Sequence, residues 1–145
     1  MRLLGLDVGE KTIGIAVSDP LGWFAQGVET LRRKDEESDL AYLQGLIKQY
    51  EATVAVVGLP LNMNGSEGPS ALRARDLGDL LSKRLNIQVE YQDERLSTVA
   101  AEKVLILGNV SRKGRKQVID KMAAVIILQN YLDRLATRKN NLHND

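Results

Sequence analysis

The sequence predicts a single mixed α/β domain, built on a five-stranded sheet that is flanked by helices. Its 145 residues suit one domain with one hydrophobic core. The first part of the chain has the pattern of three strands joined by short turns, and the rest alternates helical and strand patterns. Strands connected through helices pair in parallel, whereas a hairpin pairs antiparallel, so the expected sheet is mixed.

An antiparallel meander of three strands is expected at the N-terminus. Residues 2–8 have the pattern of a buried strand, and residues 12–18 form a second strand rich in β-branched side chains. The short Gly-containing segment between them predicts a hairpin. A weaker third strand is expected over residues 24–30.

Helices and strands alternate after this meander. Apolar residues recur at helical spacing from Leu40 to Tyr50, and acidic residues before them suit a helix N-terminus. The further expected elements are a strand over 53–57, a loop over 59–68, a helix marked by Leu77 to Leu85, a strand over 87–91, a helix from Ser97 or Thr98 to Gly108, and a long helix over 116–135. The domain is expected to span residues 1–138, with a polar C-terminal tail over 139–145.

Composition narrows the class of protein. Hydrophobic residues make up 43% of the chain, enough for a core, and the 27% of charged residues is ordinary for a globular surface. The formal net charge of +1 does not by itself indicate a polyanionic partner. The absence of cysteine excludes disulfides, zinc-thiolate sites and cysteine nucleophiles. It also fits a reducing cytosol, and because no apolar run approaches the roughly 18 residues of a membrane span, we expect no membrane contact.

Acidic residues that lie far apart in the sequence are predicted to converge. Asp7 shares one face of the first strand with Gly5, which leaves room for another group to approach. Asp93 and Glu94 directly follow the last predicted strand, at the sheet edge where α/β proteins place their chemistry. Asp120 lies early in the final helix, where alanines one turn later allow close approach to the sheet. Taken singly, each acid also has a structural interpretation as a turn, ion-pair or helix-terminus residue.

Together these acids indicate a metal site. Converging carboxylates repel one another unless a hard cation holds them, and oxygen ligands select Mg²⁺ or Mn²⁺. Two such ions, about 3.5–4 Å apart, would activate a water and stabilise the leaving oxygen of a phosphodiester. We therefore predict that Asp7, Glu94 and Asp120 are the catalytic and metal-binding acids, with Asp93 as a supporting or alternative ligand.

Basic and polar residues near these acids predict contacts with a nucleic acid. Four of the six residues 111–116 are cations, and cations that flank a metal pocket suit a phosphate backbone. The Asn-rich loop after the fourth strand is expected at the same sheet edge. The alternatives are a basic loop that serves solubility and a plain strand-to-helix connection. The predicted nucleic-acid-binding residues are Lys11, Asn62, Asn64, Arg95, Arg112, Lys113, Arg115 and Lys116.

Four segments resemble, in order along the chain, the motifs of the YqgF (RuvX) family. They are LGLDVGEKTIG at 4–14, VGLPLNMNG at 57–65, DERLST at 93–98 and IDKMAA at 119–124. The resemblance implies a ribonuclease H-like fold and a bacterial cytoplasmic nuclease that depends on a divalent metal. Carried over by position, it makes Asp7, Glu94 and Asp120 the metal-binding acids.

The function that this resemblance implies is 5′-end maturation of pre-16S ribosomal RNA, with pre-rRNA and a pre-ribosomal particle as partners of a monomer or homodimer. An alternative is a Holliday-junction resolvase that cleaves branched DNA, which requires two active sites and hence a dimer. Another is a non-catalytic RNA-binding assembly factor, which needs no metal. The segment DVGEKT also resembles the first phosphate loop of the actin-like ATPases and sugar kinases, but no Gly-rich second loop is present.

Overall fold

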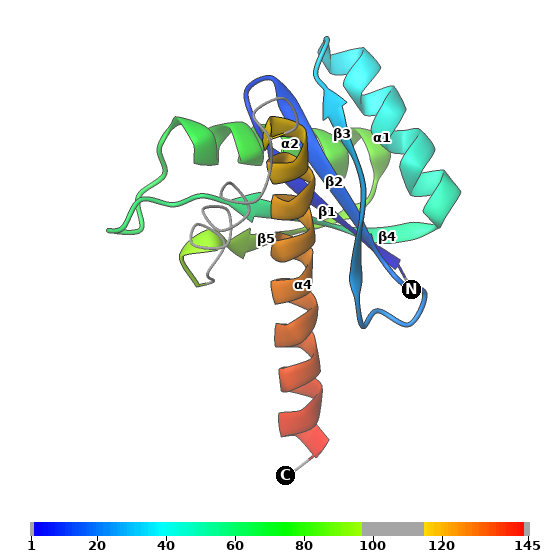
Figure 1. The fold of residues 1–145 in the computed structure, drawn as a ribbon, viewed down its shortest axis with the longest axis vertical. Coiled ribbons are helices and arrows are strands. Elements are labelled where there is room, and N and C mark those ends of the chain that lie inside the picture. Colours follow the sequence, from blue (N-terminus) through cyan, green and yellow to red (C-terminus); the bar gives the residue numbers. More distant parts are fainter. Residues whose placement is uncertain (1, 97–114, 144–145) are drawn as a thin grey trace.

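The computed structural model describes residues 2–96 and 115–143 (Figure 1), and describes side chains within 2–95 and 122–138. One sheet contains all the strands of these residues, in the spatial order β3-β2-β1-β4-β5. The first three strands pair antiparallel, while β4 pairs in parallel with both β1 and β5. The strands are β1 (Arg2–Val8), β2 (Thr12–Ser18), β3 (Ala25–Arg32), β4 (Ala52–Leu59) and β5 (Gln88–Asp93). The predicted mixed sheet is therefore confirmed.

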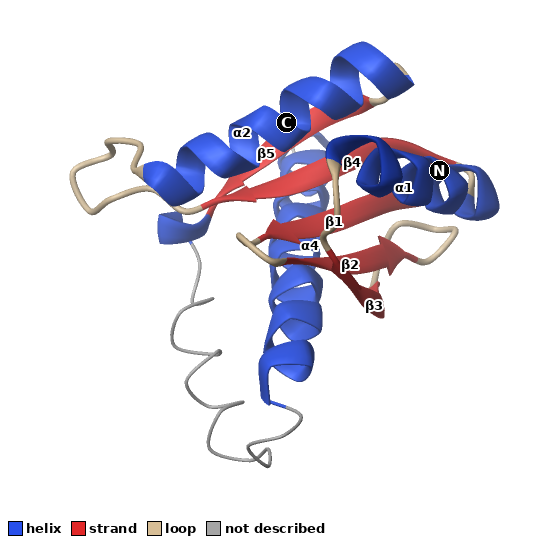
Figure 2. Cartoon of the chain, turned by 90° about the horizontal axis from the view of Figure 1, so that it is seen from above, coloured by secondary structure: helices blue, strands red, loops and turns tan. Residues whose placement is uncertain are grey.

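Helices cover both faces of this sheet. α1 (Glu36–Tyr50) and α2 (Pro69–Leu85) lie on one face, and α4 (Arg115–His143) crosses the other (Figure 2). α1 begins where the Asp35 side chain accepts a hydrogen bond of 2.8 Å from the Ser38 amide, so the acidic segment is a helix cap. A short 3₁₀ turn, η1 (Glu94–Leu96), follows β5 directly. Within the described ranges, no helix is long and apolar enough to cross a membrane.

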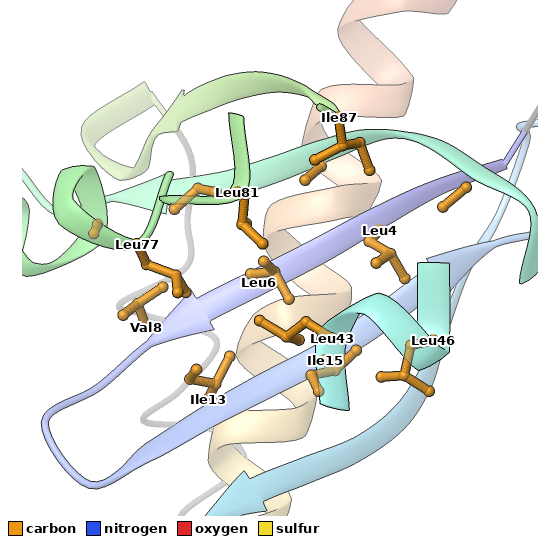
Figure 3. Close-up of a cluster of buried hydrophobic side chains, with 14 of the residues drawn as sticks. Leu4, Leu6, Val8, Ile13, Ile15, Leu43, Leu46, Leu77, Leu81 and Ile87 are labelled. Carbon is orange, nitrogen blue, oxygen red and sulfur yellow. The ribbon is translucent and has the colours of Figure 1, made fainter. Parts of the chain in front are cut away.

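The alternation of side chains along the strands gives the sheet two apolar faces. Leu4, Leu6 and Val8 of β1 face α1 and α2, where they pack against residues such as Leu43 and Leu81 (Figure 3). The opposite face is covered by α4. Its buried residues include Leu3, Ala16, Val56, Ala124, Ile127 and Leu128. Gly5 and Asp7 belong by alternation to this second face, so Asp7 lies on the side of the sheet that α4 covers.

Element boundaries differ from the predictions at several places. β3 begins and ends later than the predicted 24–30, and β5 continues past the predicted 87–91 to Asp93. α4 continues to His143, through most of the predicted polar tail, because a polar segment without Gly or Pro extends a helix readily. Its C-terminal turns project beyond the sheet (Figure 1). The helix predicted from Ser97 or Thr98 to Gly108 lies outside the described residues.

Candidate metal-dependent nuclease site

Asp7 lies near the carboxyl end of β1, between two glycines on the neighbouring strands. Gly14 of β2 is its antiparallel partner. On the other side, Leu6 pairs with Val57 of β4, so the parallel register brings Gly58 next to Asp7. Both glycines are buried, while Asp7 is half-buried. Because Gly58 has no side chain, other groups come close to β4 beside Asp7 on the face covered by α4, where Ile127 Cδ1 lies 2.5 Å from the point that a Cβ atom on Gly58 would occupy.

Glu94 brings a second carboxylate to the same place. It opens η1 directly after β5, and its Oε1 lies 3.1 Å from the point that a Cβ atom on Gly58 would occupy. The side chain therefore reaches back from β5 over β4. Glu94 Oε1 therefore lies over the residue that neighbours Asp7 on the adjacent strand, about 4.8 Å away between the two backbones.

The Asp93 carboxylate pairs with Arg95, whereas the neighbouring Glu94 carboxylate lies over Gly58. The Asp93 carboxylate accepts hydrogen bonds from the Arg95 amide at 2.9 Å and from its guanidinium, with Nη2 at 2.9 Å from Oδ2. The hydrogen bonds from the Arg95 side chain hold the pKa of Asp93 below its usual value. Arg95 Nη1 also lies 3.4 Å from the Met63 carbonyl oxygen. The Asp93–Arg95 pair thus connects the end of β5 to the Asn-rich loop.

Asp120 belongs to the part of α4 that lies one turn before the closest approach of helix and sheet. A Cβ atom on Gly5 would lie 2.6 Å from Leu128 Cβ and 3.0 Å from the Ala124 carbonyl oxygen. The room that Gly5 was predicted to leave is therefore taken by α4, at Leu128 and at Ala124, one of the alanines predicted to let this helix lie close to the sheet. The side chain of Asp120 is outside the described side chains, so its place in the acidic group stays a prediction. Among the side chains that the structure does describe, no three His, Cys, Asp or Glu residues gather as a metal site.

The Asn-rich loop after β4 is held together by its own polar groups. Asn62 Nδ2 donates to Ser66 Oγ at 2.9 Å, and Ser66 Oγ donates to Asn64 Oδ1 at 2.6 Å. Gly65 closes the turn with a φ of 87°, which favours glycine. Both asparagines are exposed while making these bonds, so the loop presents a preformed polar surface beside Arg95.

The predicted basic residues divide into separate groups. Lys11 is exposed at the β1–β2 hairpin, where it lines, together with Arg33 and Arg73, a pocket of about 550 Å³ on the side of α1 and α2. Arg115 and Lys116 belong to the first turn of α4, but their side chains are not among those described. Arg112 and Lys113 lie outside the described residues. The prediction that these four residues bind a nucleic acid remains a prediction.

Sequence reasoning missed two glycines and a buried polar residue of this face. Gly14 and Gly58 have a recognisable signal, because glycine inside a strand often marks close approach of another group. Gln92 of β5 is only 1% exposed, and its Oε1 has no hydrogen-bond partner among the described residues. The sequence carried no signal for its burial, because Gln92 shares its strand face with the polar residues Gln88 and Glu90.

The sequence of this chain matches a known protein family and several named relatives. Residues 1–134 match the RuvX family, described as Holliday junction resolvase. A protein of Heliobacterium modesticaldum named "Putative pre-16S rRNA nuclease" is 60% identical over 136 residues, which cover 94% of this chain and 91% of the relative. A protein of the same name from Halalkalibacterium halodurans is 57% identical and covers 92% of this chain and 97% of its own.

Solved structures share the fold at low sequence identity. RuvC of Thermus thermophilus, in complex with a Holliday junction substrate, has a TM-score of 0.56 at 13% identity over 94% of this chain and 97% of its own. The fowlpox virus Holliday junction resolvase has a TM-score of 0.52 at 14% identity, covering 93% and 99%. These likenesses identify the ribonuclease H-like fold. The chain, with its four ordered motifs and its matching family signature, belongs to the RuvX (YqgF) family.

Proposed function

We propose that this protein is a divalent-metal-dependent nuclease that hydrolyses phosphodiester bonds in the maturation of the 5′ end of pre-16S rRNA. The observation that carries the proposal is the Glu94 carboxylate over Gly58, beside Asp7 on the neighbouring strand. The RNA substrate is supported by the name of two relatives, "Putative pre-16S rRNA nuclease". These relatives are 60% and 57% identical to this chain.

The residues at this edge fit a hard cation. Asp7 and Glu94 offer carboxylate oxygens, the ligands that Mg²⁺ and Mn²⁺ prefer. Gly58 lets the Glu94 carboxylate come close to β4 beside Asp7, because a Cβ atom there would lie only 3.1 Å from Glu94 Oε1. In this proposal Asp120, from the helix that crosses the same face, supplies the third carboxylate.

The chemistry divides between the ion and the chain. Bound at these acids, Mg²⁺ or Mn²⁺ would supply an activated water and neutralise charge on the phosphodiester. Asp7 and Glu94 would hold the ion, and α4, which covers this face of the sheet, excludes bulk water from one side. The cations of segment 111–116 would neutralise backbone phosphates beside the site. Arg95 is paired with Asp93, so its proposed part is to position the Asn-rich loop toward the strand.

Cleavage of branched DNA is the second candidate function. The family description and the RuvC-like fold favour it. A four-way junction has two symmetric cleavage positions, so this function requires two copies of the site in one dimer. A protein that remains monomeric with the junction bound would contradict this candidate and leave the RNA nuclease untouched.

Cleavage assays with matched variants test the proposed function. Purified protein is incubated with a pre-16S 5′-end RNA fragment, or with a four-way DNA junction, in Mn²⁺, in Mg²⁺ and in EDTA. We expect cleavage of the RNA that EDTA abolishes and that Asp7→Asn, Glu94→Gln and Asp120→Asn each remove. Asp76→Asn, at an exposed position of α2, is the matched control and should cleave normally. Cleavage that persists in EDTA or in Asp7→Asn would refute the metal mechanism, and RNA binding without cleavage would indicate an assembly factor.

A further inference from the structure

Another pocket, lined by polar and charged residues, lies beside the candidate site, between β5 and α4. Its volume is about 360 Å³, within the range of pockets that hold small ligands. One strand residue, Gln92, and one side of α4 line it. The residues from α4 are Asn130, Asp133, Arg134, Thr137 and Arg138. Because Ile127 of α4 contacts the Gly58 position, this pocket begins about one helical turn beyond the site.

Buried polar atoms in this pocket lack partners within the described part of the chain. They are Gln92 Oε1, Asn130 Nδ2 and Arg134 Nε. Gln92 is almost completely buried, so bulk water does not replace the missing hydrogen bond. Native proteins pair the large majority of their buried polar atoms. Three unpaired atoms in one pocket therefore indicate a ligand that offers both a donor and acceptors.

This pattern of hydrogen-bonding groups suits the edge of a nucleobase. Gln92 Oε1 can accept from a ring or exocyclic N–H, while Asn130 Nδ2 and Arg134 Nε can donate to ring nitrogens or carbonyl oxygens. The Arg134 guanidinium lies 5.8 Å from the centre of the Tyr131 ring. Of these two groups Arg134 lines the pocket, and a guanidinium plane is a surface on which unpaired RNA bases stack.

The pocket is at the right distance to take a base from the strand that is cleaved. Gln92 and Glu94 are two residues apart, which corresponds to about 7 Å along an extended chain. A cation held by the carboxylates would bind a phosphate, and the adjoining nucleotide would then lie beside the pocket. Arg134 and Arg138 leave the pocket with a net positive charge against the single acid Asp133, which favours a nucleotide.

We propose that the pocket lined by Gln92, Asn130 and Arg134 binds one unpaired base of the RNA next to the cleaved phosphate. This inference rests on the proposed nuclease function, because that function places the phosphate. A pocket of this kind makes the enzyme selective for RNA with an unpaired nucleotide at one position. An RNA strand that is base-paired along its whole length would be a poor substrate.

Binding measurements with abasic RNA test the proposal without relying on cleavage. Single-stranded RNA from the pre-16S 5′ region carries one abasic nucleotide, moved along the strand, and its affinity is measured by fluorescence anisotropy in Ca²⁺, a cation that carboxylate oxygens also bind, with a gel to verify that the RNA stays intact. We expect Gln92→Met to weaken binding about five-fold, the effect of one hydrogen bond. An abasic nucleotide at one position should weaken it by about ten-fold, since stacking is lost as well. With that RNA, Gln92→Met should have no further effect.

Matched variants keep the test decisive. Gln88→Met changes an exposed glutamine of the same strand, whose Nε2 bonds to Glu90, and should bind like wild type. Asn130→Ala should lose affinity at the same abasic position, even if Gln92→Met fails to fold. The proposal is overturned if the losses of RNA affinity caused by Gln92→Met and by the abasic nucleotide add at every position. It is also overturned if the wild-type protein does not bind the RNA. If the RNA is cleaved normally but the two losses of affinity are independent, only this inference is refuted. If the losses depend on each other but the RNA is not cleaved, only the nuclease function is refuted.

Discussion

Replacing Gly58 with alanine separates the packing of α4 from the placement of Glu94. The added Cβ would lie 2.5 Å from Ile127 Cδ1 and 3.1 Å from Glu94 Oε1. Carbon atoms in contact are normally about 3.5–4.0 Å apart, so Ile127 must retreat by roughly 1 Å. The carboxylate must move by a few tenths of an ångström. Overpacking of this kind lowers the free energy of unfolding by about 1–3 kcal/mol.

A second substitution relieves one of these contacts and keeps the other. Ile127→Val removes the Cδ1 atom and alone should cost about 0.5–1.5 kcal/mol. In the Gly58→Ala background the same deletion removes the closest contact, so the double variant should be nearly as stable as Ile127→Val. Relief is partial, because Ile127 Cγ1 would remain 3.2 Å from the new methyl group. The expected coupling between the two substitutions is about 1–2 kcal/mol.

Activity should not follow stability in this cycle. The contact with Glu94 survives in the double variant, so we expect Mn²⁺-dependent cleavage to fall about ten-fold in Gly58→Ala and to stay low when stability recovers. Urea unfolding with an unchanged m-value measures the stability, and gel cleavage assays measure the rate. Free energies that simply add would refute the contact between Gly58 and Ile127. A rate that recovers with stability would refute the role of Glu94 placement.

Three further predictions concern the ion pair, the buried amide and the basic segment. The pKa of Asp93 is lowered in the folded state, so its pair with Arg95 stabilises the protein above the unfolded pKa of about 3.9, and this stabilisation is lost as the pH falls through the folded pKa. The difference in the free energy of unfolding between wild type and Asp93→Asn, measured by urea unfolding, should therefore shrink from pH 6 to pH 3. A difference that stays constant would contradict the pairing. Gln92→Met should raise the free energy of unfolding by about 1 kcal/mol, because it removes a buried hydrogen-bond acceptor without a partner. Calorimetry measures this change, with Gln88→Met as the control. A loss of stability would indicate that the Gln92 amide oxygen has a hydrogen-bond partner. Replacing Arg112 and Lys113 with alanine should reduce the salt dependence of RNA binding by about 0.7 in slope for each lost phosphate contact, and an unchanged slope would place the RNA elsewhere.

Local patterns in the sequence were sufficient for the architecture. β1 and β2 have the predicted boundaries, because a buried apolar run and a short turn each depend on residues close in the chain. The face of Asp7 follows from the two-residue period of a strand. The close approach of α4 was also predictable, since Gly5 and the alanines around Ala124 are small residues on facing elements.

Only the tertiary structure shows the different partners of Asp93 and Glu94. The sequence predicted Glu94 as the metal-binding acid and Asp93 as a supporting or alternative ligand, but it could not show that Asp93 ends β5 while Glu94 opens η1. The turn of the chain into η1 directs one carboxylate to Arg95 and the other over Gly58. The same holds for Gly58 and Gln92, whose neighbours are set by the register of β4 with β1 and by the docking of α4. Strand register and helix docking join residues distant in sequence, and for this reason composition and periodicity predicted the layers while the folded chain decided which side chains meet.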